Sequence, residues 1–307
     1  MRALVAAPAL GAGAVELRQV DEPVPGAGHA IVRVAATSLN RGECGALLQA
    51  ADGWRPGWDL AGTVVTATAS GPPEGTRVVG WANGGAWAER VAVRADHLAP
   101  IPDDLSFEVA ATLPVAGLTA AGVLAAAGSV RGRRVAITGA AGGVGRFAIQ
   151  LARTSGAHVT AVVGSTERGE GLAELGADEV VVGLRSEGEP LDLVVESAGG
   201  PSLAAALARV SEDGTVVSFG NSSNETTSFD ARSFYRRGAP TMVGFFVTHE
   251  LLRGRIGSPQ LATLVSLVSE GKLRTDIGLR SPWTEANGAI RALLERRVRG
   301  KAVLTID

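Results

Sequence analysis

A glycine-rich turn is the part of this sequence with the clearest chemistry. Gly139, Gly142 and Gly145 are spaced three apart, between an apolar run at 135–138 and a helical pattern at 145–155. In a strand–turn–helix of this kind the first glycine permits the bend, the second lets the backbone approach a pyrophosphate, and the third lets helix and strand pack closely. The helix N-terminus then holds the phosphates. A purely structural turn is the alternative. We predict a dinucleotide site formed by Gly139, Ala141, Gly142, Gly143, Val144 and Gly145.

The residues after the next predicted strand bear on which dinucleotide binds. An NAD site has an acidic residue about 20 positions after the motif begins. Here Val163 is followed by Gly-Ser-Thr-Glu-Arg, with no carboxylate at the strand tip. Ser165 can donate to a phosphate and Arg168 can pair with one, while Glu167 can point away as a first-turn acid of a helix at 167–175. We therefore expect NADPH; the alternative is that Arg168 only makes a surface contact.

Strands and helices alternate around this turn. Alternation of this kind predicts right-handed strand–helix–strand crossovers and a mostly parallel sheet. The predicted strands are 135–138, 159–163, 179–182, 191–196, 215–219 and 241–247, and the predicted helices are 145–155, 167–175 and 202–210.

The flanking parts of the chain have a different texture. Short apolar runs separated by Gly and Pro predict strands and a small barrel or distorted sheet. The tail has two amphipathic helices, the first capped by Ser258 and ended by Gly271, the second starting at Thr284, and then a strand at 302–306. We expect the tail to rejoin the first domain. The early strands are predicted at 3–7, 30–36, 60–67, 77–81 and 86–93, before a helical stretch at 110–127.

Composition excludes several classes of protein. The formal net charge of −2 over 307 residues gives no electrostatic case for nucleic acid or an anionic membrane. A single cysteine, Cys44, excludes an internal disulfide and a thiolate-rich metal site. There is no signal-peptide pattern and no apolar run long enough to span a bilayer. We expect a cytoplasmic protein whose partner is a small-molecule substrate.

Several blocks in order resemble the medium-chain dehydrogenase/reductase superfamily, and within it the zinc-independent quinone oxidoreductase group. The resemblance covers nearly the whole chain. Besides the glycine-rich segment, it rests on Thr-Ser-Leu-Asn at 37–40 with Glu43, Pro-Gly-Trp-Asp-Leu-Ala-Gly at 56–62, Gly-Ala-Trp-Ala-Glu at 85–89, Leu-Pro-Val-Ala-Gly-Leu-Thr-Ala at 113–120 and Arg-Gly-Lys-Ala-Val-Leu at 299–304.

This resemblance implies an α/β protein of two domains. A GroES-like, β-rich catalytic domain would comprise residues 1–113 and 248–307, and a Rossmann NADPH-binding domain with a doubly wound parallel sheet would comprise 114–247. It also implies that Thr119, Gly220 and Phe245 lie against the nicotinamide. Members commonly dimerise through the last Rossmann strand, here 241–247, and an unpaired apolar edge strand favours such pairing.

Two departures from the family limit the assignment. Gly57-Trp58-Asp59 stands where zinc-dependent relatives have Gly-His-Glu, and the four histidines are scattered, so we expect no zinc site. Quinone reductases often have a tyrosine between the positions of Cys44 and Trp54, whereas the only tyrosine here is Tyr235. The proton donor therefore stays unassigned, and water can serve.

The expected chemistry is hydride transfer from NADPH to a quinone, an enone or another activated double bond. Asn40 is the candidate catalytic and cofactor-binding side chain, as a hydrogen-bond donor to the ribose or to an enolate; a turn-forming Asn is the alternative. Glu43 and Asp59 are expected to be local hydrogen-bond acceptors. The alternative function is a non-catalytic NADPH-binding or redox-sensing protein of the same fold.

Overall fold

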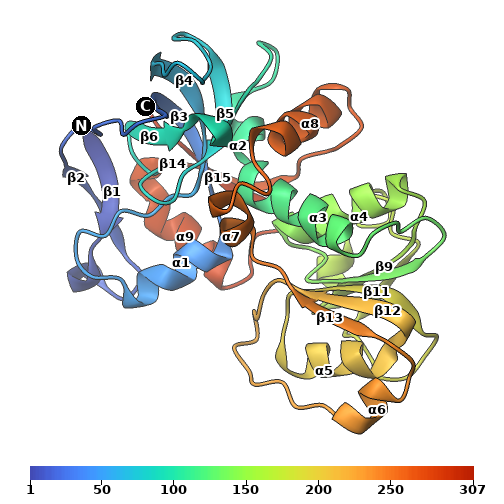
Figure 1. Cartoon of the computed structure of the whole chain (residues 1–307). Helices are drawn as coiled ribbons and strands as arrows, with labels where there is room; N and C mark the ends of the chain where they lie inside the picture. Colours follow the sequence, from blue (N-terminus) through green and yellow to red (C-terminus); the bar gives the residue numbers. More distant parts are fainter. The chain divides into compact units, whose positions relative to one another are not determined.

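A computed structural model describes all 307 residues (Figure 1). The chain forms two compact units: Met1–Leu118 with Thr248–Asp307, and Thr119–Val247. The sequence-based boundary after residue 113 would put the whole of helix α3 (Pro114–Ala126) in the second unit. In the structure the division between the two units falls within this helix, after Leu118.

The second unit is built on a six-stranded sheet in which every neighbouring pair is parallel. Its strand order is β10-β9-β8-β11-β12-β13, so the order reverses beside β8, at the topological switch point where doubly wound folds bind ligands. The strands are β8 (Arg134–Thr138), β9 (His158–Val163), β10 (Glu179–Val182), β11 (Leu191–Glu196), β12 (Val210–Ser218) and β13 (Thr241–Gly244).

Helices cover both faces of this sheet. Helix α4 (Gly143–Thr154) packs on β8 and β9, and α5 (Gly200–Arg209) packs on β11 and β12. Figure 1 shows these two helices on opposite sides of the strands. A short helix, α6 (Ala231–Tyr235), precedes β13.

Two expectations for the second unit are wrong. The helix predicted at 167–175 is only a 3-10 turn, η4 (Thr166–Gly169). Gly169 and Gly171 interrupt the pattern, and Gly171 has φ +77°, which ends a right-handed helix. The last strand, expected at 241–247, ends at Gly244, because α7 (Val247–Leu252) begins soon after it.

The first unit holds a seven-stranded sheet and a separate β1–β2 hairpin. The path of the sheet is β14-β15-β3-β4-β5-β7, with β6 paired to β3. The tail does rejoin this unit, since β15 pairs antiparallel with β3. The strands are β1 (Arg2–Ala6), β2 (Val15–Gln19), β3 (His29–Leu39), β4 (Asp59–Thr66), β5 (Arg77–Trp81), β6 (Arg90–Arg94), β7 (Leu98–Pro100), β14 (Ile277–Pro282) and β15 (Lys301–Thr305).

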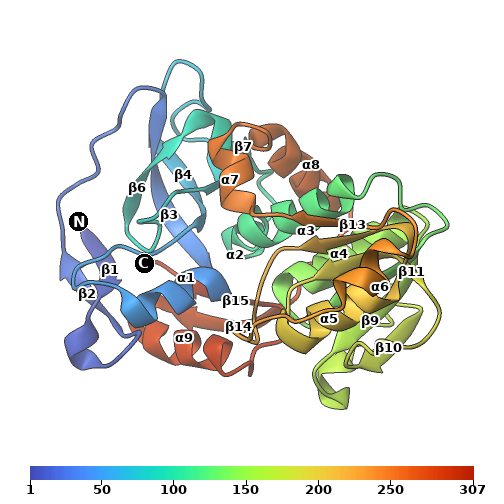
Figure 2. The same ribbon diagram turned by 60° about the horizontal axis from the view of Figure 1, so that its bottom comes forward.

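Besides α7 and the start of α3, four helices belong to this unit. They are α1 (Arg41–Ala46), α2 (Phe107–Ala111), α8 (Ser258–Ser269) and α9 (Ala286–Leu294). Figure 2 shows α1 beside α9, and both pack on a core that includes Trp87 and Trp283. Three details differ from the sequence-based expectation. The cap of α8 is Gly257 and not Ser258, β6 starts at Arg90, and β2, β7 and β14 had not been anticipated.

Candidate functional site

The turn between β8 and α4 requires glycine at two of its positions. Gly139 has φ +60°, and a Cβ atom there would lie 2.6 Å from Ser197 Oγ. A Cβ atom at Gly145 would lie 2.6 Å from Ala140 Cα and 2.7 Å from the Gly139 carbonyl oxygen. Real Cβ contacts are not that short, so the bend and the close packing of helix on strand both depend on glycine.

Gly142 has a different environment. It is the N-cap of α4, with φ −82°, and a Cβ atom there would meet only the Gly139 carbonyl oxygen at 3.3 Å. The first hydrogen bond of the helix joins Arg146 N to Gly142 O at 3.0 Å. The backbone amides of Gly143 and Val144, both half-buried, therefore precede the first intrahelical hydrogen bond. They lie at the positive end of the dipole of a 12-residue helix. This is the geometry that binds phosphate groups.

A buried carboxylate organises the neighbouring loop after β11. Glu196 accepts hydrogen bonds from Ser202 Oγ at 2.8 Å and from Ala198 N and Gly199 N, each at 3.0 Å. It also accepts one from Thr138 Oγ1 at 3.2 Å, which ties the ends of β8 and β11 together. Sequence reasoning had not singled out Glu196, although a carboxylate that ends a buried strand is an indication of such a role.

Gly220 and Ser197 lie close together at the same edge of the sheet. A Cβ atom at Gly220 would lie 3.0 Å from the Ser197 carbonyl oxygen. Ser197 in turn is bound to Thr138, with its amide 2.8 Å from Thr138 Oγ1. The structure thus brings Gly220 near the end of β8, where the glycine-rich turn begins.

The loop after β9 places Ser165, Glu167 and Arg168 within one turn. Arg168 N donates to Ser165 O at 3.2 Å. The Ser165 hydroxyl donates to the exposed Glu167 carboxylate, and this hydrogen bond holds the pKa of Glu167 below its usual range. Glu167 is a first-turn acid as expected, but of a 3-10 turn and not of an α-helix. Its ionised carboxylate therefore lies beside Ser165, the side chain expected to donate a hydrogen bond to a phosphate.

Thr119 and Phe245 are brought together around α3. A Cβ atom at Gly122 would lie 2.2 Å from Phe245 Cζ, so the phenyl ring packs directly on this helix. Thr119 is one helical turn away from Gly122 and is buried. The remaining sequence-predicted residue, Ala141, is buried in the turn itself.

Asn40 belongs to a buried polar network in the first unit. Its Nδ2 donates to Glu43 Oε1 at 3.0 Å and to Asp59 Oδ2 at 2.9 Å, and its Oδ1 accepts from Lys301 Nζ at 2.7 Å. Lys301 Nζ also donates to Asp59 Oδ2 at 3.2 Å. The backbone contributes as well, since Trp58 N donates to Glu43 Oε2 at 2.9 Å. All four polar side chains are buried.

The network holds two carboxylates and only one cation. Burial, together with the neighbouring Asp59 charge, raises the pKa of Glu43 to about 8, although hydrogen bonds from Asn40 and the Lys301 charge oppose the rise. A proton retained on Glu43 makes the set electrically neutral, which a dry interior favours. Glu43 and Asp59 are thus local hydrogen-bond acceptors, as expected.

Asn40 is the N-cap of α1 and forms a capping box with Glu43. Both hydrogens of its side-chain amide are donated inside the protein, so a substrate could receive one only if a bond to Glu43 or Asp59 opened. Arg41, the next residue, donates to the carbonyl oxygens of Leu293 and Leu294 at 3.2 and 3.1 Å, which caps the C-terminus of α9.

The structure offers no second site with comparable chemistry. No group of three His, Cys, Asp or Glu residues is arranged to hold a metal ion. Burial raises the pKa of the Cys44 thiol well above its usual value. No helix is long and apolar enough to cross a membrane.

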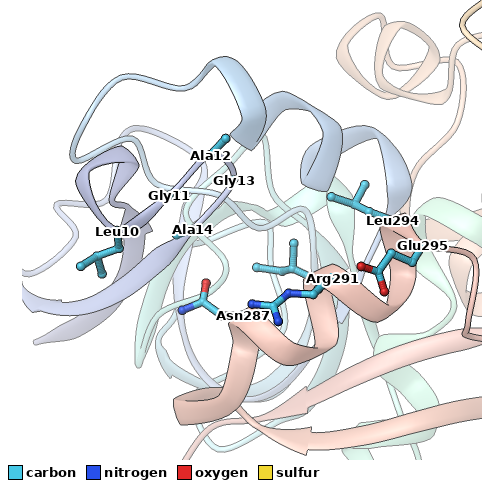
Figure 3. A pocket seen from close by; sticks show the side chains of 10 residues that line it. Leu10, Gly11, Ala12, Gly13, Ala14, Asn287, Arg291, Leu294 and Glu295 are labelled. Atoms are coloured by element: carbon cyan, nitrogen blue, oxygen red, sulfur yellow. The ribbon is translucent and has the colours of Figure 1, made fainter.

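A groove of about 380 Å³ lies between the turn at 10–14 and α9 (Figure 3). Asn287 lines it, and its side chain exchanges two hydrogen bonds of 2.8 Å with the backbone of Val15, accepting from Val15 N and donating to Val15 O. Glu295 pairs with Arg297 at 2.7 Å. Arg291 also lines the groove and is exposed. None of these groups is placed for redox chemistry.

Comparisons with known proteins agree with this description. The chain matches the model "Alcohol dehydrogenase GroES-like domain" over residues 26–103 and the model "Zinc-binding dehydrogenase" over 143–269. It is 30% identical over 321 residues to the chloroplast envelope quinone oxidoreductase homolog of Arabidopsis thaliana, which covers 96% of this chain and 94% of that protein. It is 36% identical over 296 residues to the spectinabilin polyketide synthase system protein NorB of Streptomyces orinoci, a match covering 91% of this chain and 13% of that protein.

Among solved structures, the quinone oxidoreductase of Thermus thermophilus, which has also been solved in complex with NADPH, superimposes with a TM-score of 0.85 at 30% identity and covers 100% of both chains. The chain therefore belongs to the medium-chain dehydrogenase/reductase superfamily, in its quinone oxidoreductase-like group, a family of oxidoreductases. The GroES-like domain and the Rossmann sheet are the two parts of its fold.

Proposed function

We propose that this protein is an NADPH-dependent, zinc-independent reductase that transfers a hydride to a quinone, an enone or another activated double bond. The observation that carries the proposal is the glycine-rich turn at the switch point of the sheet. There, packing demands glycine at Gly139 and Gly145, whereas a Cβ atom at Gly142 would meet a single atom, the Gly139 carbonyl oxygen at 3.3 Å, and Gly142 precedes helical amides without an intrahelical partner.

The choice of NADPH rests on the loop after β9. Ser165 and Arg168 lie within one turn, and a 2′-phosphate would compete with Glu167 for the Ser165 hydroxyl. A guanidinium binds a phosphate through paired, charge-assisted hydrogen bonds. The Thermus thermophilus relative, solved with NADPH, gives further support.

When bound, the reduced nicotinamide supplies a hydride to the electrophilic carbon of the acceptor. For an enone, the π electrons of the double bond move onto oxygen, and a proton from water completes a two-electron reduction to the saturated ketone. The family resemblance assigns Thr119, Phe245 and the backbone near Gly220 to the positioning of the nicotinamide. Asn40 is held in its buried network, where it would help to position the neighbouring polar side chains. Its amide group would contact the ligand only after one of its hydrogen bonds, to Glu43 or to Asp59, had opened.

The absence of a zinc site is part of this proposal. Trp58 stands between Gly57 and Asp59, and its backbone amide donates to Glu43. Both oxygens of Asp59 accept hydrogen bonds inside the protein, Oδ2 from Ser38 Oγ at 2.5 Å and from the Asn40–Lys301 pair, and Oδ1 from Val115 N at 2.8 Å.

We also propose a homodimer that pairs β13 with its copy. This strand is the edge of the six-stranded sheet, and its Met242 side chain is 46% exposed. An exposed apolar edge is a template for strand pairing. Sedimentation of the wild-type protein beside a Met242→Lys variant tests this, since a wild-type monomer contradicts it.

The second candidate is a protein that binds NADPH without turning it over. It is favoured by the lack of a poised proton donor, because Tyr235 is 63% exposed on α6 and the carboxyls of Glu43 and Asp59 are buried in hydrogen bonds. In such a protein the cofactor would stabilise the fold or report the redox state.

One experiment separates the two functions. NADPH binding is first measured by titration, and NADPH oxidation is then followed with a panel of quinones and enones. Steady turnover with any acceptor eliminates the non-catalytic protein. Tight binding without oxidation across the whole panel eliminates the reductase, and failure to bind NADPH eliminates both.

A further inference from the structure

The chain contains two Asn-Gly dipeptides, Asn83-Gly84 and Asn287-Gly288, and both lie in the first unit. In such a pair the backbone nitrogen of the glycine can attack the side-chain amide carbon of the asparagine, because glycine has no Cβ atom to obstruct the approach. The reaction requires both groups to be free to move together. The structure gives the two pairs opposite surroundings in this respect.

The pair Asn83-Gly84 lies in the loop between β5 and β6, where neither reacting group is restrained. The Asn83 side chain is exposed and takes part in no hydrogen bond, and neither does the backbone amide of Gly84. Gly84 has φ +118°, and a Cβ atom there would meet only the Arg55 carbonyl oxygen, at 3.5 Å. The Gly84 nitrogen and the Asn83 amide carbon can therefore approach each other without breaking a hydrogen bond.

The backbone on either side of this pair is anchored. Ala82 N donates to Trp58 O at 2.8 Å, and Gly85 N donates to Arg55 O at 3.1 Å. These two bonds hold the ends of the loop against the segment that leads into β4. The loop therefore stays in place while the unbonded pair between the anchors changes conformation.

Asn287, by contrast, is restrained at both atoms of its side-chain amide. It lies in the first turn of α9 (Figure 3), where its Oδ1 accepts from Val15 N and its Nδ2 donates to Val15 O, each at 2.8 Å. Attack by Gly288 N would require both bonds to break and the backbone at Asn287 to leave the helical conformation. Folding therefore protects this pair and leaves the pair at Asn83 reactive.

We propose that Asn83 is a site of spontaneous deamidation. The Gly84 nitrogen forms a bond to the side-chain amide carbon of Asn83, the bond from that carbon to the amide nitrogen breaks, and ammonia leaves with the proton of the Gly84 amide. Water then opens the cyclic imide. Hydrolysis at the former side-chain carbonyl gives aspartate, and hydrolysis at the main-chain carbonyl gives isoaspartate, in which the chain runs through the side chain. The reaction consumes one water and needs no oxidant or reductant.

The isoaspartyl product changes the loop in two ways. It adds one methylene to the backbone between the anchors at Ala82 and Gly85, and it bears a carboxylate in place of a neutral amide. Because the anchored residues are separated only by the reacting pair, the added length strains their bonds to Trp58 and Arg55. Deamidation thus loosens this loop as the protein ages.

Timed incubation of the wild-type protein in mildly alkaline buffer, followed by mass analysis of its tryptic peptides, tests the site. Trypsin releases residues 78–90 and 281–291, each with a single asparagine and no glutamine, so a gain of one mass unit is assigned without ambiguity. In the folded protein the 78–90 peptide should gain this mass at least about tenfold faster than 281–291, because two hydrogen bonds oppose the reaction only in the latter. In urea-unfolded protein the two rates should be comparable, which makes Asn287 the internal control.

Equal rates for the two peptides in the folded protein overturn the proposal. A 78–90 peptide that reacts in urea but not in the folded protein overturns it as well. Asn83→Gln keeps an exposed amide but closes a ring far more slowly, so it should abolish the mass gain at 78–90 and leave that at 281–291 unchanged. A mass gain that persists at 78–90 in this variant contradicts the assignment to Asn83.

A second measurement tests the effect on the loop. The isoaspartyl fraction of aged protein is separated by anion exchange and identified by methyl transfer from S-adenosylmethionine with an isoaspartyl methyltransferase. Its stability is then compared with that of Asn83→Asp, which has the same added charge on an ordinary backbone. The isoaspartyl fraction should unfold at a lower urea concentration, followed by tryptophan fluorescence. Equal unfolding midpoints overturn the strain assigned to the loop.

Discussion

The buried carboxyl of Glu43 predicts a specific pH dependence of stability. Its pKa in the folded protein is about 8, against an ordinary value of 4.5. Because the folded state binds this proton more tightly than the unfolded state, the stabilisation is fully present below pH 4.5 and is lost as the pH rises to 8. At about 1.4 kcal/mol per pKa unit, the loss approaches about 5 kcal/mol as an upper value.

Glu43→Gln is the perturbation that isolates this effect. The amide oxygen of the substituted side chain can still accept a hydrogen bond from Asn40. Its amide nitrogen, however, would face Trp58 N, so that two donors would meet, and the variant should be less stable than the wild type at low pH by about 1–3 kcal/mol. Because the variant lacks the Glu43 carboxyl, it should not show the loss of stability that this group causes between pH 5 and 8. The difference in unfolding free energy between wild type and variant should therefore shrink steadily as the pH rises, and then change sign.

The assay can be confined to the relevant half of the molecule. All five tryptophans, at 54, 58, 81, 87 and 283, lie in the first unit, so their fluorescence reports the unfolding of that unit alone. Urea unfolding followed by this signal at several pH values gives the difference directly. Glu174→Gln, which changes an exposed carboxylate of the second unit, is the control and should show no such trend. A wild-type-minus-variant difference that is constant from pH 5 to 8 refutes the reasoning.

Four other substitutions give sharp outcomes. Lys301→Met leaves two buried carboxyls without their cation and should destabilise the first unit by about 3–5 kcal/mol, measured by the same fluorescence. Gly145→Ala should destabilise the second unit by about 1–3 kcal/mol through its 2.6 Å contact, seen by circular dichroism, whereas Gly142→Ala should leave stability nearly unchanged and weaken NADPH binding in a titration. The opposite pattern would contradict the roles given to these glycines. Arg168→Gln should raise the KM for NADPH about 10- to 100-fold without changing that for NADH; equal changes for both cofactors would place Arg168 outside the site.

The second unit was predictable because its signals are local. Buried parallel strands are short apolar runs, and each glycine of the turn lies within a few residues of the atoms that require it. Where prediction failed there, at 167–175, helical periodicity was outweighed by the backbone freedom of Gly169 and Gly171. Strand β14 was missed because its residues alternate between half-buried and exposed, without an apolar run to mark it.

The buried network was out of reach of sequence reasoning for a different reason. Asn40 and Lys301 are 261 positions apart, and only the pairing of β15 with β3 brings them together. Asn40 alone looked like a turn residue or a ligand donor, since nothing nearby reveals that both of its amide hydrogens are already taken.

The pairing of β15 with β3 also sets an order of events during synthesis. The second unit is one continuous segment, Thr119–Val247, and is complete on the ribosome before β14 and β15 exist. The first unit, although its synthesis begins earlier, must hold Glu43 and Asp59 without Lys301 until the last strand emerges. A nascent chain therefore keeps its N-terminal part unfinished while the second unit folds, which reverses the usual N-to-C order of domain maturation. Chaperones that act on this protein should engage the N-terminal part longest.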